Sequence, residues 1–251
     1  MTYQIARMGW KKDNPDGRDL TYQAPHVVLP SMVDLEDQFP EVFDQEREGS
    51  CTAQAIAGLV VYDQLQQGLP VVTPSRNFLY YFERLAEHTV NSDAGASLRD
   101  GMKVLAKIGA PPETFWPYLE SNLFTRPIQQ AIDAAKLQRA TSYMRVHQNI
   151  NSIRLSLANK QPYCFGFTVY TSFMSQEVAD TGIVPMPDFS KEGVEGGHAP
   201  VCMGYDDNRR LVKCRNSWGK QWGLNGYFWM PYEYITNPNL AGDLWVLKTI
   251  S

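Results

Sequence analysis

Three side chains in separate segments of the sequence could form one nucleophilic site. Cys51 follows a Gly-Ser pair at the start of a predicted helix, His198 opens a predicted strand, and Asn216 ends the next predicted strand. A thiolate can attack a carbonyl carbon, an imidazole can take up and return a proton, and an amide oxygen can hold the imidazole ring in one orientation. These residue types, in this order, predict a Cys-His-Asn site for acyl-transfer chemistry.

The expected position of Cys51 favours its ionised form. A free thiol has a pKa near 8.5, and both a helix N-terminus and a neighbouring imidazolium stabilise the thiolate. The alternative is a buried structural cysteine, which is common, but His198 and Asn216 favour the catalytic interpretation. The other histidines lie in an extended arm, at a helix end and in a polar connection, and we expect ordinary structural or surface roles for them (His26, His88 and His147).

The sequence that begins at Asn216 is long and specific. It reads N-S-W-G-x-x-W-G-x-x-G-Y and ends at Tyr227, and it is rich in rare residues. Together with Cys51 and His198, it makes the chain resemble the papain-like cysteine peptidases, and among them the compact bacterial members without a long propeptide. That family places its cysteine near the mature N-terminus and its histidine and asparagine far downstream.

The resemblance implies roles for further residues. Gln45 lies at the offset before Cys51 at which the family's glutamine donates its side-chain amide to the oxyanion, together with the backbone N–H of the cysteine. Gly197, Ala199 and Gly95 are expected to bind substrate at the edge of the cleft, because residues with small or absent side chains leave room for a peptide.

Two tryptophans complete the predicted site. Trp218 follows Asn216 closely, and we expect its ring to cover the hydrogen bond between His198 and Asn216 and to exclude water from it. Trp222 is a candidate for substrate binding, with plain packing in the core as the alternative.

Departures from the family pattern surround the nucleophile. Glu48 stands where many members have a disulfide cysteine, Thr52 stands where they have a tryptophan, and Glu46 replaces a frequent glycine after the oxyanion glutamine. Loss of the disulfide suits a reducing compartment. The change at Glu46 leaves the local loop geometry open.

Periodicity predicts helices in the first half of the chain and strands in the second. We predict a helix over 51–67, helices capped by Ser75 and Ser97, and helical stretches over 127–138 and 151–159. Strands are predicted over 163–170, 198–205, 211–216, 226–230 and 244–250. This order indicates the α+β class.

The resemblance refines this into a papain-like two-lobe fold. It implies a helical left lobe and an antiparallel, β-barrel-like right lobe with the active-site cleft between them. We expect a single peptidase unit over 1–251, in which 1–44 form an extended arm, about 45–120 the helical lobe with Cys51, and about 121–251 the β lobe with His198 and Asn216. We interpret the arm as structural, and its role as an inhibitory segment stays open.

Two other cysteines lie on the predicted strands beside the site. If His198 and Asn216 face each other across one hairpin, Cys202 faces Val212 and Cys214 faces Pro200. The two thiols are then not paired directly, and we expect both to be free.

Composition excludes several classes of protein. The 251 residues are 43% hydrophobic and 20% charged, as in ordinary globular proteins, and the net charge of −4 argues against nucleic acid as the main partner. The sequence contains no apolar run of membrane-spanning length and no secretory signal at its start. Four scattered cysteines make no disulfide framework. We therefore expect a cytoplasmic location, with export by a signal-independent route as the alternative.

The predicted function is hydrolysis of peptide bonds by a cysteine endopeptidase. The mechanism needs no metal or cofactor, and the implied partners are a peptide or protein substrate and protein inhibitors, with a monomer favoured. Two alternatives remain, namely a Cys-dependent acyltransferase of the transglutaminase-like kind and a peptidase-like binding module without activity. The physiological substrate, the subsite preference and the choice between endo- and exopeptidase cannot be derived from this sequence.

Overall fold

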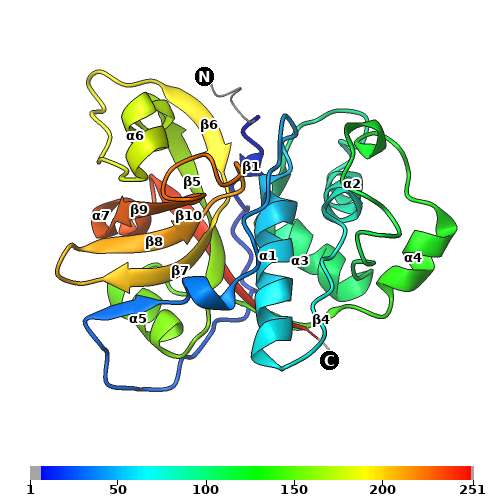
Figure 1. Ribbon diagram of the computed structural model, residues 1–251, viewed down its shortest axis with the longest axis horizontal. Helices are drawn as coiled ribbons and strands as arrows, with labels where there is room; N and C mark the ends of the chain where they lie inside the picture. Colours follow the sequence, from blue (N-terminus) through cyan, green and yellow to red (C-terminus); the bar gives the residue numbers. More distant parts are fainter. Residues whose placement is uncertain (1–6, 250–251) are drawn as a thin grey trace.

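The computed structural model describes residues 7–249, which form two halves side by side (Figure 1). One half is helical, and the other is built on a sheet with short helices around it. The helical half contains α1 (Cys51–Gln66), α2 (Arg76–Ala86), α3 (Leu98–Lys107) and α4 (Gln129–Ala135). The sheet half carries α5 (Ile150–Ala158), α6 (Gln176–Thr181) and α7 (Tyr232–Thr236). Single 3-10 turns lie at Glu36–Gln38, Glu120–Asn122 and Thr171–Met174.

The sheet is antiparallel. Its strands run in the order β4 (Ala140–Arg145), β10 (Ala241–Thr249), β5 (Tyr163–Tyr170), β7 (Val201–Asp206), β8 (Leu211–Arg215) and β9 (Tyr227–Pro231). Two further strands join from the side, β2 (Met32–Asp34) on β7 and β6 (Val194–His198) on β5. Within residues 7–249 the end strands β4 and β9 do not pair, so the sheet is open and is not a closed barrel. The α+β class is confirmed.

The predicted helix caps are present. The Ser75 hydroxyl accepts a hydrogen bond from the backbone N–H of Phe78, and the Ser97 hydroxyl accepts one from Asp100. Each cap satisfies a donor that the first helical turn leaves free. Most residues of α1 are buried because this helix runs between the two halves (Figure 1). Its first residue, Cys51, therefore lies at the junction of the halves.

Two hydrophobic clusters fill the halves. One joins α1, α2, α3 and α4 with side chains of β10, and the other lies around the opposite side of the sheet. Helix α4 packs with the helices: a Cβ added to Gly109 would lie 1.9 Å from the carbonyl oxygen of Ala135. The division of the chain near residue 120 stays a prediction, although α4 lies beyond it and packs with the helical half.

The predicted strand over 198–205 is wrong in one respect, because it is two strands. His198 ends β6, where it pairs with Phe167 of β5, and the chain then breaks at Pro200 before β7 begins. Proline has no N–H to continue a ladder, so it separates the two pairings.

The hairpin register predicted from His198 and Asn216 is also wrong. His198 pairs with β5 rather than with β8, and β7 contains a bulge. Cys202 therefore lies directly opposite Cys214. Both are buried free thiols in the structure.

The N-terminal arm crosses both halves. Its first strand, β1 (Trp10–Lys11), pairs in parallel with β3 (Ala96–Ser97) just before α3. Further along, Asp13 and Asp19 form ion pairs with Arg145, and Asp19 also pairs with Arg99 of α3 at 2.6 Å. These ion pairs anchor the arm to both halves.

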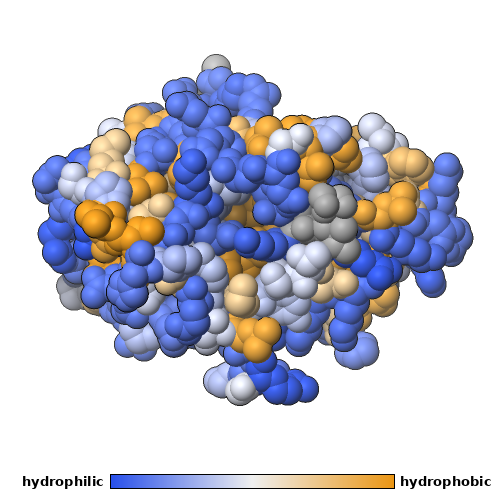
Figure 2. Space-filling model, turned by 90° about the horizontal axis from the view of Figure 1, so that it is seen from below, coloured by the Kyte–Doolittle hydropathy of each residue, from blue (hydrophilic) through white to orange (hydrophobic). Residues whose placement is uncertain are grey.

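The surface seen from below is mostly hydrophilic, and its apolar residues form separate small patches (Figure 2). None of the helices within residues 7–249 is long and apolar enough to span a membrane.

Candidate active site

Cys51 lies at the N-terminus of α1 and is fully buried. Backbone N–H groups of Ala199 and Gly9 form hydrogen bonds to its sulfur, and both favour the thiolate. Burial outweighs them and raises the pKa of the Cys51 thiol to about 12. In this arrangement of the chain, the thiol is therefore protonated at neutral pH.

His198 is held by Asn216. The His198 Nε2 atom lies 2.7 Å from Asn216 Oδ1, and the same oxygen accepts a hydrogen bond from the backbone N–H of Ser217. Because Oδ1 is an acceptor, Nε2 carries the proton, and Nδ1 is the basic nitrogen of the neutral ring. Burial lowers the pKa of His198 to about 4, against the effect of the Asn216 hydrogen bond. The Nδ1 atom is buried and has no hydrogen-bond partner.

Trp218 covers the imidazole. The ring centroids of Trp218 and His198 are 4.9 Å apart. Trp222 lies behind Trp218 in an edge-on contact at 5.1 Å, and it also contacts Phe173 and Phe228. Only 3% of its surface is exposed. The structure thus gives Trp222 a packing role, and its contact with substrate stays a prediction.

Gln45 is fixed by contacts from several directions. Its backbone N–H donates to the carbonyl oxygen of Ser217, and its side-chain Oε1 accepts from the Ser217 hydroxyl at 2.7 Å. Its Nε2 donates to the carbonyl oxygens of Glu48 at 2.8 Å and Arg7 at 3.2 Å. The Tyr118 hydroxyl donates to the Gln45 carbonyl oxygen at 2.8 Å. Sequence reasoning assigned no role to Ser217, although it lies within the motif that begins at Asn216, and it missed Tyr118, because a single tyrosine gives no signal without a spatial neighbour.

Two of the departures from the family pattern, Glu46 and Glu48, lie in the loop before Cys51. Glu46 has a φ of 52°, a conformation that glycine adopts without strain. Glu48, in place of the disulfide cysteine, is buried, and burial raises the pKa of its carboxyl to about 7.

An acidic residue holds the same loop from the helical half. Both carboxylate oxygens of Asp93 lie 3.1 Å from the backbone nitrogen of Gly49, and the Tyr80 hydroxyl donates to Asp93 Oδ1. The backbone N–H of Gly95 in turn donates to Tyr80 at 3.0 Å. Asp93 and Tyr80 therefore hold both the turn before Cys51 and Gly95, the predicted substrate-binding glycine.

The arm lies over these residues. The carbonyl oxygen of Gly9 accepts a hydrogen bond from the backbone N–H of Ala96 at 2.7 Å. A Cβ added to Gly9 would lie 1.8 Å from the Gly49 carbonyl oxygen, and one added to Gly95 would lie 2.1 Å from the Gly9 oxygen. Backbone meets backbone here without side chains between. Residues 7–11 thus occupy the site next to Cys51. We had interpreted the arm as structural and did not predict this position for it.

Gly197 also borders the arm. A Cβ added to it would lie 2.4 Å from the carbonyl oxygen of Trp10. Of the predicted substrate-binding residues, Ala199 forms a hydrogen bond to Cys51, and Gly95 and Gly197 border the arm. Trp222 lies behind Trp218. Sequence reasoning missed Ala96, whose N–H is the donor to the bound main chain.

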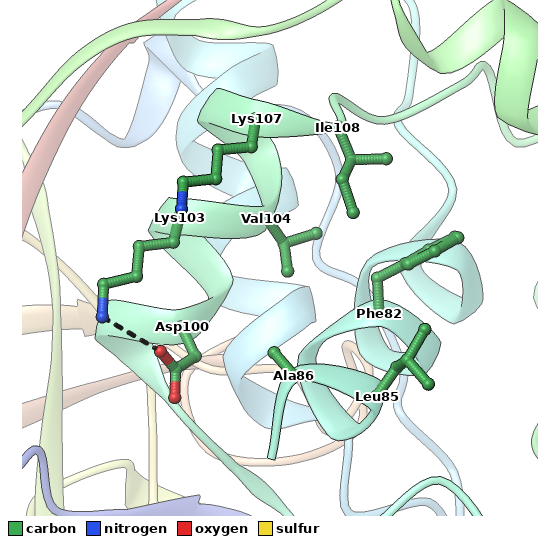
Figure 3. A pocket seen from close by; sticks show the side chains of 8 residues that line it. All are labelled: Phe82, Leu85, Ala86, Asp100, Lys103, Val104, Lys107 and Ile108. Carbon is green, nitrogen blue, oxygen red and sulfur yellow. Dashed lines mark hydrogen bonds and ion pairs between the residues drawn. The ribbon is translucent and has the colours of Figure 1, made fainter. Parts of the chain in front are cut away.

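A separate apolar groove lies between α2 and α3 (Figure 3). Lys103 and Lys107 border it, and Lys103 pairs with Asp100 at 3.4 Å. It contains none of the predicted site residues. Within the described part of the chain, no cluster of three or more His, Cys, Asp or Glu side chains is placed to hold a metal ion.

Comparison with known proteins identifies the class to which this fold and site belong. The profile described as papain family cysteine protease matches residues 29–242. Xylellain, a cysteine protease from Xylella fastidiosa, is similar in structure, with 40% sequence identity, a TM-score of 0.92, and coverage of 98% of this chain and 97% of that one.

Two curated relatives agree. An uncharacterized peptidase C1-like protein of Acanthamoeba polyphaga mimivirus is 35% identical over 280 residues, covering 100% of this chain and 89% of its own length. A cathepsin B-like protein of Giardia intestinalis is 28% identical over 228 residues, covering 88% of this chain and 70% of its own. The chain belongs to the papain family of cysteine proteases, and it is a cysteine peptidase. Residues 7–28 of the arm lie outside the family match.

Proposed function

We propose that the chain is a cysteine endopeptidase in which Cys51 is the nucleophile, His198 the general acid and base, Asn216 the residue that orients the imidazole, and Gln45 an oxyanion donor. The observation that carries the proposal is the 2.7 Å contact between His198 Nε2 and Asn216 Oδ1, because it leaves Nδ1 as the basic atom of the ring. The hydrogen bond from Ala199, the residue after His198, to the Cys51 sulfur supports the pairing of the two elements.

The proposed reaction has two acyl-transfer steps. The Cys51 sulfur gives its proton to His198 Nδ1 and attacks the scissile carbonyl carbon, and the oxyanion receives hydrogen bonds from Gln45 Nε2 and the Cys51 backbone N–H. His198 protonates the leaving amine as the C–N bond breaks and a thioester forms. A water molecule, deprotonated by His198, then attacks the thioester and releases the acid and the thiol.

The way in which the site accommodates a main chain supports internal cleavage. The arm passes Cys51 with bound backbone on both sides, since Arg7 contacts Gln45 and Gly9 contacts Ala96. A site that holds continuous chain in both directions suits an endopeptidase better than an exopeptidase, which must bind a chain terminus.

The same contacts indicate a latent enzyme. The arm buries Cys51 and occupies the Gln45 amide, and burial shifts the pKa values of Cys51 and His198 toward the neutral thiol and neutral imidazole. Displacement of residues 7–11 is therefore proposed to precede turnover, because solvent access favours the charged pair.

Brief alkylation with near-stoichiometric iodoacetamide at mildly acidic pH, followed by peptide mapping, tests the proposal. We expect Trp10→Ala to loosen the arm and to allow selective labelling of Cys51. This labelling should be lost in Trp10→Ala/His198→Ala. The three other cysteines are buried and serve as internal controls (Cys164, Cys202 and Cys214).

Product analysis completes the test. The same variant is expected to cleave an unstructured protein at internal bonds, in a manner that depends on Cys51. Uniform slow labelling of all four cysteines would contradict the nucleophile assignment. Predominant transfer to an added amine acceptor would favour the acyltransferase, and release of single terminal residues would favour an exopeptidase.

A further inference from the structure

The hydroxyl of Tyr118 joins the two ends of the loop that carries both proposed oxyanion donors. It donates a hydrogen bond to the main-chain carbonyl oxygen of Gln45 at 2.8 Å, and it lies 2.8 Å from the hydroxyl oxygen of Ser50. Gln45 provides the side-chain donor, and Ser50 immediately precedes Cys51, whose backbone N–H is the other donor. One hydroxyl therefore closes the loop between the two donors.

Ser50 does not cap α1, although it stands at the N-cap position. Its side chain makes no cap hydrogen bond, whereas Ser75 and Ser97 cap α2 and α3 in the usual way. A serine at this position normally accepts a hydrogen bond from the second or third backbone N–H of the helix. The Ser50 hydroxyl contacts Tyr118 instead. A local rule that is broken next to the nucleophile indicates a role in the site rather than in the helix.

A line of hydrogen bonds continues behind Ser50. Gln54 Nε2 donates to Ser50 Oγ at 3.2 Å, and Arg76 donates to Gln54 Oε1 at 3.1 Å. Since Tyr118 uses its only hydroxyl proton for Gln45, the Ser50 hydroxyl is the donor to Tyr118. All hydrogen bonds from Arg76 to the Gln45 carbonyl oxygen thus point in the same direction. Hydrogen bonds aligned in a chain strengthen one another.

Arg76 also holds the ring of Tyr118 in place. The Arg76 Cζ atom lies 4.3 Å from the centroid of the Tyr118 ring and 4.7 Å from that of Phe43. Glu113 fixes the guanidinium through two hydrogen bonds, at 2.9 and 2.5 Å. An arginine that is stacked on rings and bonded twice to one carboxylate has little freedom to move. The Tyr118 hydroxyl is therefore presented to the loop in one position.

We propose that Tyr118 is a positioning residue for the oxyanion site, and that it holds the Gln45 amide and the Cys51 backbone N–H at the separation that the transition state requires. It acts through Gln45 and Ser50 rather than on the substrate. The effect is expected to be large, because a hydrogen bond to an oxyanion contributes fully only at the geometry of the transition state. This inference rests on the proposed function.

Tyr118→Phe removes the hydroxyl and keeps the ring that stacks on Arg76. Tyr205→Phe is a matched control, because the Tyr205 hydroxyl of β7 also donates to a main-chain carbonyl oxygen, that of Pro30, at 2.7 Å. Both changes are made in the full chain that carries Trp10→Ala, so that the arm does not limit access to the site. The melting temperature of each variant establishes that it is folded under the assay conditions.

Two rates separate an effect on the oxyanion from an effect on the thiol. Turnover of a peptide needs the oxyanion donors, whereas alkylation of Cys51 by iodoacetamide needs only the thiolate. We expect Tyr118→Phe to lower kcat by about ten-fold or more, and to leave KM and the alkylation rate within about three-fold of those of Trp10→Ala alone. Tyr205→Phe should change none of these values. A smaller decrease of kcat, or an alkylation rate that falls in parallel with kcat, overturns the proposal.

A double substitution tests whether Tyr118 acts through the oxyanion donors. If it does, Tyr118→Phe should lower kcat by a smaller factor in a chain that also carries Gln45→Ala, because one of the donors that it positions is then absent. Equal decreases with and without Gln45→Ala would give Tyr118 an independent role and would contradict the proposal.

Hydrogen exchange separates this proposal from the proposed function. In Tyr118→Phe, we expect the backbone amides of residues 45–51 to exchange about ten-fold faster than in Tyr205→Phe, as loss of one hydrogen bond to the loop predicts. Mass spectrometry of the peptides that cover the loop measures the rates. If no Trp10→Ala variant shows Cys51-dependent turnover, the proposed function fails, and Tyr118 is judged on exchange alone. Faster exchange confined to this loop supports Tyr118 as the residue that holds it, and equal exchange in the two variants overturns this assignment.

Discussion

The side-chain amide of Gln45 donates a hydrogen bond to the main-chain carbonyl oxygen of Arg7 at 3.2 Å. The donor that we assign to the oxyanion therefore already holds a peptide carbonyl from the same chain. Ser217 fixes the other end of this amide through a hydrogen bond to Oε1, so that Nε2 points toward the bound chain. These contacts support our proposal that Gln45 is a preorganised oxyanion donor, which displacement of Arg7 frees for substrate.

Removal of the Gln45 amide should slow chemistry more than it weakens binding. In the Trp10→Ala background, we expect Gln45→Ala to lower kcat by about 10²–10³, the effect measured for one oxyanion donor in acyl-transfer enzymes. Steady-state kinetics on a fixed peptide give the value. Gln66→Ala, which changes an exposed glutamine of α1, is the control. If kcat falls by less than about three-fold, Gln45 does not act as an oxyanion donor.

The ion pairs of Asp19 should keep the arm in place. Asp19 pairs with Arg99 and Arg145, each at 2.6 Å, and all three side chains are largely buried. Because loss of one partner of a buried ion pair is destabilising by about 3–5 kcal/mol, Asp19→Asn should loosen the arm and raise turnover of the otherwise unaltered chain several-fold. Initial rates and the melting temperature are measured together, so that loss of folding is recognised.

Asp16 offers a control in the same segment. Its 2.6 Å pair with Arg18 lies at the surface, where the arginine side chain is 87% exposed, and such pairs contribute little. Asp16→Asn should leave turnover unchanged. If Asp19→Asn and Asp16→Asn behave alike in a folded protein, the ion pairs do not restrain the arm.

Much of the fold could be predicted from local signals. Capping serines at Ser75 and Ser97 begin helices where expected, and the predicted strand over 163–170 coincides with β5. Strand pairing was harder, because it depends on distant segments. Nothing near His198 reveals that it pairs with β5, and the bulge in β7 shifts Cys202 opposite Cys214.

The candidate site, like the fold, was predictable where it depends on local motifs and not where it depends on distant contacts. Of the residues carried by motifs, Cys51 begins α1, and His198 contacts Asn216 at 2.7 Å. Their catalytic roles stay predictions. The position of the arm in the site was not predicted. The arm makes its contacts there with backbone atoms of Gly9 and with the indole of Trp10, which packs against Gly166 and Gly197. A glycine that makes room for another residue cannot be recognised from the sequence until that neighbouring residue is known.

The charge next to His198 Nε2 should control its pKa. Burial lowers the pKa of His198 to about 4, and the neutral Asn216 opposes this only in part. Asn216→Asp would place a carboxylate at the ring, and we expect the pKa to rise by at least about one unit because an adjacent anion favours the imidazolium. NMR titration of the His198 Cε1–H signal measures it, with His26 in the exposed arm as an internal reference. A lower or unchanged pKa would contradict the assigned contact.

A buried acid beside the nucleophile should make stability depend on pH. Glu83 of α2 is fully buried and accepts a hydrogen bond from the Thr52 hydroxyl at 2.6 Å, and burial raises the pKa of its carboxyl from 4.5 to about 8. Between these two values the folded chain retains a proton that the unfolded chain releases. The stabilisation is therefore complete below pH 4.5 and is lost as the pH rises toward 8.

Glu83→Gln removes this dependence, since the amide is neutral at every pH and its oxygen can still accept from Thr52. One pKa unit corresponds to about 1.4 kcal/mol. The free energy of unfolding of the variant, relative to that of the unaltered chain, should therefore increase by roughly 2–3 kcal/mol between pH 5 and pH 7. Urea unfolding at a series of pH values measures the difference. Glu177→Gln, at an exposed position of α6, should show no such trend. A difference that stays constant with pH would mean that Glu83 is ionised in the folded protein at neutral pH.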